Sequence, residues 1–143
     1  MSPIHATSVA RRTPDGWRGV LLTGPSGAGK SDMALRLIGR GWRLVADDYS
    51  LVWRSADALY AAAPPAIAGR IEARGIGIVP APCIGLARMV LLVECGHEPV
   101  ERMPEFRTVT IAGVVLPSMR LDIRSASAVE TVLARLDSGL GAP

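Results

Sequence analysis

The sequence predicts one α/β domain in which a mixed sheet carries added β-hairpins. Residues 18–23 have the pattern of a short buried strand, and an eight-residue glycine-rich loop follows at once. Apolar residues then recur at helical spacing up to Ile38. Further strand patterns occur along the chain, and a chain of 143 residues can bury a sizeable core. We therefore expect a single domain over residues 1–143.

The remaining elements follow in order along the chain. After the first helix we expect one strand that ends in two aspartates, an antiparallel strand pair and a proline-containing loop, at 44–46, 49–53 with 59–61, and 61–69. We then expect an alternating segment that turns at two glycines, a buried strand, an exposed loop, paired strands and a final helix, at 70–77, 89–94, 96–105, 109–111 with 113–116, and 127–136. The tail from Gly139 to Pro143 is expected to be frayed.

Composition restricts the classes of function. The net charge is only +3 and the basic residues are scattered, so nucleic-acid binding is not indicated. No apolar run is long enough to cross a bilayer and no secretion signal is recognisable, so we expect no membrane association. The two cysteines, Cys83 and Cys95, form neither a disulfide framework nor a metal-binding spacing. We therefore expect a cytoplasmic protein whose two thiols lie in or near the core.

The glycine-rich loop matches the phosphate-binding P-loop pattern Gly-x-x-x-x-Gly-Lys-Ser, and its residues are Gly24, Pro25, Ser26, Gly27, Ala28, Gly29, Lys30 and Ser31. Glycines let successive backbone N–H groups converge on an anion, and the start of the helix adds its positive end. Lys30, the only lysine among 16 basic residues, would reach the outer phosphates from an exposed loop. Ser31 would offer its hydroxyl to Mg²⁺. The sequence therefore predicts a nucleoside triphosphate site.

Two segments could supply the carboxylate that P-loop proteins hold near Mg²⁺. One strand pattern ends in Glu94, and another ends in Asp47 and Asp48 soon after the P-loop helix. Ligands of open α/β sheets gather beyond the carboxyl ends of strands, which favours the aspartate pair. Adjacent side chains of an extended strand point to opposite faces. We therefore expect one aspartate to face the phosphates and the other to support the metal or the backbone.

Together these residues resemble the catalytic domain of HPr kinase/phosphorylase, in a short form without the N-terminal domain. The resemblance covers most of residues 4–120 and rests on the P-loop, Ala34-Leu35, Arg40-Gly41, the strand 44–48 and the Glu-x-Arg-Gly-x-Gly-Ile segment within 71–78. It implies a P-loop kinase-like domain that uses ATP and Mg²⁺ to phosphorylate a serine of HPr, the phosphocarrier of the sugar phosphotransferase system. It also implies a reverse phosphorolysis and a homo-oligomer, commonly a hexamer.

The resemblance implies a role for individual side chains. The P-loop would hold the nucleotide, Ser31 and Glu72 would bind Mg²⁺, and the catalytic group would comprise Asp48, Asp47, His5, Lys30 and Arg102. One aspartate would take the serine proton. We favour Asp48 because it lies farther beyond the strand end, with Asp47 as the alternative. Arg102 resembles a family arginine of a mobile loop, where its guanidinium could meet phosphate oxygens.

Two other functions stay open. A small-molecule kinase would use the same P-loop, although neither an arginine-rich lid nor a small-substrate motif is recognisable in the sequence. A nucleotide-sensing module would bind a partner with negligible turnover. The chain also departs from longer family members at residues 117–120, a region that the resemblance connects with phosphorolysis. We therefore expect kinase activity with weak phosphorolysis, to which Arg120 could still contribute a cation.

Overall fold

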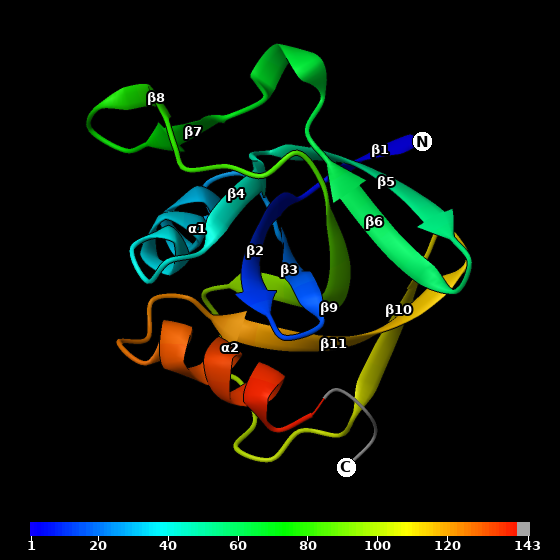
Figure 1. Ribbon diagram of the computed structural model, residues 1–143. Helices are drawn as coiled ribbons and strands as arrows, with labels where there is room; N and C mark the ends of the chain where they lie inside the picture. The colour runs from blue at the N-terminus through cyan, green and yellow to red at the C-terminus, as the bar shows by residue number, and fades with distance from the viewer. Residues whose placement is uncertain (140–143) are drawn as a thin grey trace.

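The computed structural model describes residues 1–139, which fold into a curled mixed sheet with helices packed against it (Figure 1). The helices are α1 (Lys30–Ile38) and α2 (Ala128–Asp137), with a short 3-10 turn at Pro65–Ile67. The strands are β1 (Ser2–His5), β2 (Thr7–Thr13), β3 (Gly16–Thr23), β4 (Arg43–Ala46), β5 (Tyr49–Ser55), β6 (Ala58–Ala62), β7 (Arg70–Ala73), β8 (Gly77–Pro80), β9 (Ala87–Gly96), β10 (Arg107–Ile111) and β11 (Val114–Asp122).

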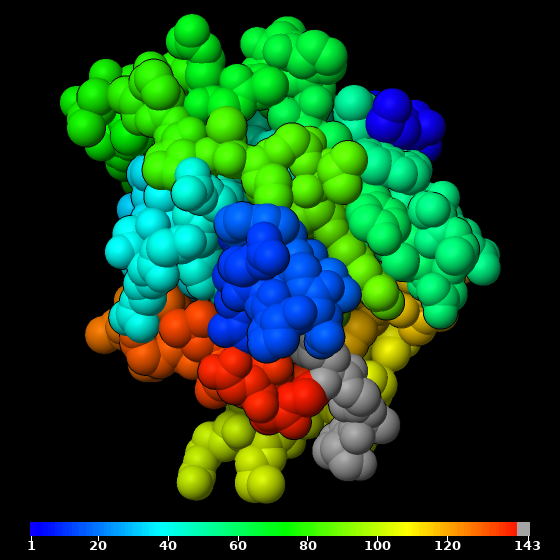
Figure 2. All heavy atoms as spheres, in the orientation of Figure 1, coloured from blue at the N-terminus to red at the C-terminus, as the bar shows by residue number. Residues whose placement is uncertain are grey.

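Nine strands form one sheet that branches at β9. The main path runs β1-β5-β6-β9-β3-β2-β4. Residues 87–89 of β9 pair with β6, whereas residues 92–96 pair with β11, which in turn pairs with β10. β7 and β8 form a separate two-stranded hairpin that stands out from the body of the molecule (Figures 1 and 2).

The strand directions bring the P-loop and Asp47 to one edge of the sheet. β9 runs parallel to β3, and β2 is antiparallel to both β3 and β4, so β4 runs in the same direction as β3. The carboxyl ends of β3, β4 and β9 therefore meet at one edge. There the P-loop leaves β3, Asp47 follows β4, and Thr7 begins β2.

The core lies on both faces of the sheet, because successive side chains of a strand alternate between faces. On β3, Val20 and Leu22 pack in the cluster that includes Leu37 of α1 and Val132 of α2. Leu21 points the other way, into a cluster to which β6, β9 and β11 contribute most of the buried residues. The amphipathic faces of both helices thus cover one side of the sheet and fix the start of α1 beside the P-loop.

The α/β class with a mixed sheet and added hairpins is confirmed, and particular elements differ from the predictions. Strands β1 and β2 were not predicted, and β11 continues to Asp122 as a parallel partner of β9. Cys95 is buried as expected, but Cys83 is exposed. The predicted frayed tail lies largely outside the described residues. Across residues 1–139, no helix is both long enough and apolar enough to span a membrane.

Candidate active site

The P-loop connects β3 to α1 through backbone conformations that glycine tolerates. Gly24 has φ 143° and Gly29, which caps α1, has φ 102°. A Cβ atom built on Gly24 would lie 2.4 Å from the carbonyl oxygen of Cys95, and one on Gly29 would lie 2.5 Å from Cδ1 of Ile123. No side chain caps the start of α1. The first N–H groups of the helix can therefore donate to an anion held by the loop.

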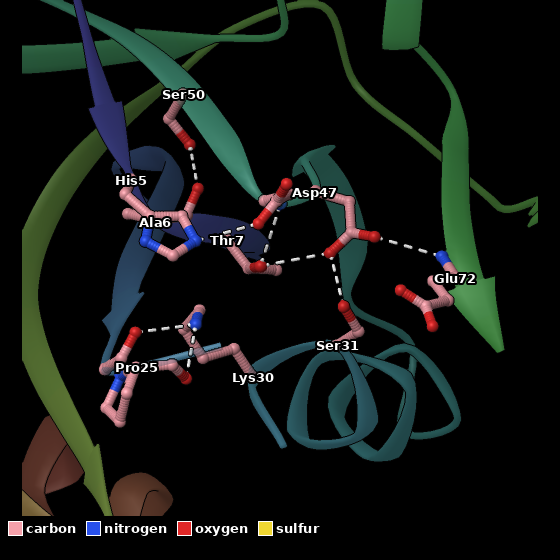
Figure 3. Close-up of polar contacts among 11 residues, drawn as sticks. His5, Ala6, Thr7, Pro25, Lys30, Ser31, Asp47, Ser50 and Glu72 are labelled. Carbon is pink, nitrogen blue, oxygen red and sulfur yellow. Dashed lines mark hydrogen bonds and ion pairs between the residues drawn. The ribbon is translucent and has the colours of Figure 1, made fainter. Parts of the chain in front are cut away.

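Lys30 differs from the expectation of an exposed loop lysine, because it is only 6% exposed. Its Nζ atom donates to the carbonyl oxygens of Gly24 and Pro25, at 2.7 and 3.0 Å (Figure 3). The ammonium thus folds back over the loop and ties its two ends together. Its charge lies where the loop backbone converges, which suits the neutralisation of phosphate oxygens.

Asp47 is the buried member of the aspartate pair, at 8% exposure. Its Oδ1 atom accepts hydrogen bonds from the hydroxyls of Ser31, at 2.7 Å, and Thr7, at 3.0 Å. Its Oδ2 atom accepts from the backbone N–H of Glu72, at 3.0 Å (Figure 3). Asp47 therefore joins the first turn of α1 to β7 and to the start of β2.

Asp48 has the opposite surroundings. Its side chain is 61% exposed, and its Oδ1 atom lies 2.8 Å from Nε2 of His5. The His5 ring in turn packs against Tyr49, with 5.2 Å between the ring centroids. Asp48 adopts a left-handed backbone conformation, φ 67°, which carries its carboxylate away from the strand direction. The structure thus brings His5 and Asp48 together, although 43 residues separate them.

The other predicted site residues, Glu72 and Arg102, have exposed side chains. The side chain of Glu72 is exposed and extends from β7 toward the side on which Ser31 lies, while its backbone contacts Asp47 (Figure 3). No group of three or more His, Cys, Asp and Glu side chains within residues 1–139 is arranged to hold a metal. Arg102 lies exposed on the loop between β9 and β10. Thr7 was not predicted as a site residue, because its position at the start of β2 gave no local signal of a polar contact.

A cavity of about 450 Å³ adjoins the other side of the P-loop. Its walls come from the loop, from the end of β9 and the residues after it, and from β11, namely Pro25–Ala28, Glu94–Glu98, Val100, Arg120 and Leu121. Nε2 of His97 lies 3.1 Å from the carbonyl oxygen of Ala28, and Arg120 forms an ion pair with Glu98 at 3.2 Å. Burial raises the pKa of the Cys95 thiol, which belongs to this wall, to about 12, and nearby Lys30 opposes part of the rise.

Comparison with known proteins identifies the family. A family model described as the HPr Serine kinase C-terminal domain matches residues 17–135. The chain belongs to this family. The matched range contains the whole P-loop, both aspartates and Glu72, whereas His5 and Thr7 precede it.

Curated relatives in the HPr serine kinase family match over a shorter range. HPr kinase/phosphorylase of Lacticaseibacillus casei (strain BL23) is 48% identical over 62 residues, which is 43% of this chain and 19% of the relative. HPr kinase/phosphorylase of Clostridium tetani (strain Massachusetts / E88) is 46% identical over 66 residues, which is 46% of this chain and 22% of the relative. The chain thus matches about a fifth of the length of these two relatives.

A solved structure shares the fold. The Hpr(Ser) kinase/phosphatase from Coxiella burnetii superposes with a TM-score of 0.79 and covers 96% of this chain and 95% of that chain. The sequence identity is 24%. The agreement extends over nearly all of both chains, so the two chains share the same overall fold.

Proposed function

We propose that the protein transfers the γ-phosphoryl group of ATP to a serine of an HPr-like phosphocarrier protein. One observation carries the proposal: an exposed, histidine-paired carboxylate and a P-loop meet at the same edge of the sheet, with a buried carboxylate between them. A phosphoryl transfer needs a cradle for the donor and a group that receives the proton of the acceptor hydroxyl. Family membership supports the choice of HPr as the acceptor.

The loop residues fit a nucleotide triphosphate. The backbone N–H groups of the loop and the uncapped start of α1 would bind the phosphates, and Lys30 would contact their outer oxygens. On binding, the ammonium exchanges its bonds to two backbone carbonyls for bonds to phosphate oxygens. The cavity beside the loop gives the nucleoside a place on the side away from the aspartates.

The donor set also fits Mg²⁺, which prefers oxygen ligands and keeps several waters beside the phosphates. The Ser31 hydroxyl and the Asp47 carboxylate are 2.7 Å apart, and the Glu72 side chain extends toward the same side. Mg²⁺ held there would neutralise charge on the phosphates of the donor. Asp47 would hold the Ser31 hydroxyl in place and would give a further oxygen to the coordination shell.

Asp48 would act as the base. The serine oxygen bonds to the γ-phosphorus, and the bond from that phosphorus to the oxygen bridging the β- and γ-phosphates breaks. ADP leaves, and the serine proton passes to Asp48. His5 donates to Asp48 and orients its free carboxylate oxygen toward the acceptor. Asp47 is less suited to this step, since it already accepts three hydrogen bonds.

We also propose that Arg102 contacts phosphate oxygens once the carrier binds, because it lies on an exposed loop next to the end of β9. Phosphorolysis would be weak. Arg120 is the cation of residues 117–120, the segment that differs from longer family members. It lines the cavity beside the P-loop but is paired with Glu98. We further propose that the protein forms a homo-oligomer, as the family resemblance implies. Its molar mass in solution, measured by light scattering, tests this.

The test incubates the protein with Mg²⁺, radiolabelled ATP and a purified HPr-like carrier. Label on the carrier, absent when the acceptor serine is changed to alanine and reduced in Asp48→Asn, is the expected result. ATP binding with no label on the carrier would overturn the proposal and favour a nucleotide sensor. Label that appears only on small molecules of a cell extract would instead favour a small-molecule kinase. The reverse reaction is tested by incubating the protein with phosphorylated carrier, phosphate and Mg²⁺ in the absence of nucleotide. The release of pyrophosphate then measures phosphorolysis.

A further inference from the structure

We propose that Thr7 is the positioning residue that holds both aspartates in their separate roles, an inference that rests on the proposed phosphoryl transfer. Thr7 is fully buried at the start of β2. Its hydroxyl donates to Oδ1 of Asp47 at 3.0 Å and accepts the backbone N–H of Asp48 at 3.1 Å. One hydroxyl thus contacts the side chain of the first aspartate and the backbone of the second.

The register of the sheet explains how Thr7 reaches this position. Val9 pairs with Leu44, and unbroken antiparallel pairing would then set Thr7 opposite Ala46. Instead Ser8 pairs with Ala46, because Val45 is the extra residue of a β-bulge. The shift of one residue brings Thr7 level with the aspartate pair. A regular strand would offer it an alanine.

The backbone of Asp48 needs such support. A non-glycine residue with φ 67° is uncommon, and surrounding contacts must hold it there. The bond from its N–H to Thr7 fixes the peptide that enters this conformation. The conformation in turn sets the direction in which the Asp48 carboxylate meets His5. Loss of the hydroxyl would therefore displace the proposed base without any change to its own side chain.

A pair of buried hydroxyls beside Thr7 provides a control. It allows an effect on the position of the aspartates to be distinguished from a general effect on stability. Oγ of Ser8 lies 2.8 Å from Oγ of Ser50, and Ser50 donates to the carbonyl oxygen of Ala6 at 2.9 Å. Both serines are fully buried, as Thr7 is. This pair ties β2 to β5, and neither hydroxyl contacts an aspartate among the described residues. Ser8 is therefore a matched control in the same strand.

The experiment compares Thr7→Val, Thr7→Ser and Ser8→Ala with the wild type. Valine keeps the shape of threonine but removes both hydrogen bonds, whereas serine keeps the hydroxyl. We expect Thr7→Val to lower kcat by about tenfold or more, with the nucleotide Kd within about twofold of wild type. Thr7→Ser should recover most of kcat, and Ser8→Ala should keep it even if its melting temperature falls as far as that of Thr7→Val.

Hydrogen exchange gives a readout that does not depend on activity. The Asp48 amide, assigned by NMR, should exchange faster in Thr7→Val and near the wild-type rate in Thr7→Ser and Ser8→Ala. Unchanged exchange at Asp48 in Thr7→Val overturns the proposal, and so does a kcat loss in Ser8→Ala equal to that in Thr7→Val. If the wild type phosphorylates no carrier, the proposed function fails, while the exchange rates still decide whether Thr7 positions Asp48.

Discussion

Changing Asp48 to asparagine separates catalysis from stability, because the two aspartates differ so much in burial. The variant keeps the size of the side chain and removes its ability to take a proton. The ion pair with His5 is solvent-exposed on both sides, and such pairs contribute about 0–1 kcal/mol to the free energy of unfolding. General acid–base groups contribute about 100- to 10,000-fold to rate. We therefore expect a kcat loss in that range with little change in stability.

Asp47→Asn is the matched comparison. We expect this change to lower stability, whereas Asp48→Asn lowers mainly kcat. Its carboxylate accepts three hydrogen bonds in a buried position, and an amide would turn one oxygen into a donor. If that nitrogen faces the N–H of Glu72, two donors oppose each other. An unsatisfied buried polar group costs about 1–3 kcal/mol. We therefore expect a clear drop in the unfolding free energy, together with a rise in the Mg²⁺ concentration needed for half-maximal activity.

The assay pairs urea denaturation with steady-state transfer of label from ATP to the carrier at saturating Mg²⁺. The reasoning is refuted if Asp48→Asn keeps half or more of the wild-type kcat. It is equally refuted if Asp48→Asn loses more stability than Asp47→Asn, because the burial of the two carboxylates would then not govern their roles.

Three other substitutions have expected outcomes. Lys30→Ala should abolish measurable ATP binding in calorimetry, and it should also lower the melting temperature, because the ammonium bonds two loop carbonyls. Glu72→Gln should raise the Mg²⁺ concentration needed for half-maximal transfer, with partial recovery in excess Mg²⁺; an unaltered titration counts against a metal role. Cys95 should make stability fall between about pH 9 and pH 12, since the unfolded thiol ionises there while the folded thiol stays protonated. Denaturation of wild type and Cys95→Ala across that range should show the steeper fall only in the wild type.

The sequence allowed the P-loop, its flanking strand and helix, and the aspartate pair to be predicted, because each depends on neighbours in the chain. β1 and β2 could not be predicted in this way. The first half of β2 is wholly buried but begins with the hydroxyl residues Thr7 and Ser8, so no apolar alternation marks it. Their partners lie 40 and 42 residues away, in the segment around Asp47. The burial of Lys30 was not predicted for a related reason. Its partners are backbone carbonyl oxygens of the loop, and they come within reach of the ammonium only in the folded conformation of the loop.

The separate surroundings of Asp47 and Asp48 arise from backbone geometry, not from residue type. In a regular strand two adjacent carboxylates would differ only in the face to which they point. Here the bulge at Val45 brings the first one level with Thr7, and the left-handed backbone turns the second toward His5 and solvent. A buried carboxylate with three donors is held rigidly, which suits a group that fixes Ser31. An exposed carboxylate with one donor keeps an oxygen free, which suits a group that must receive and release a proton.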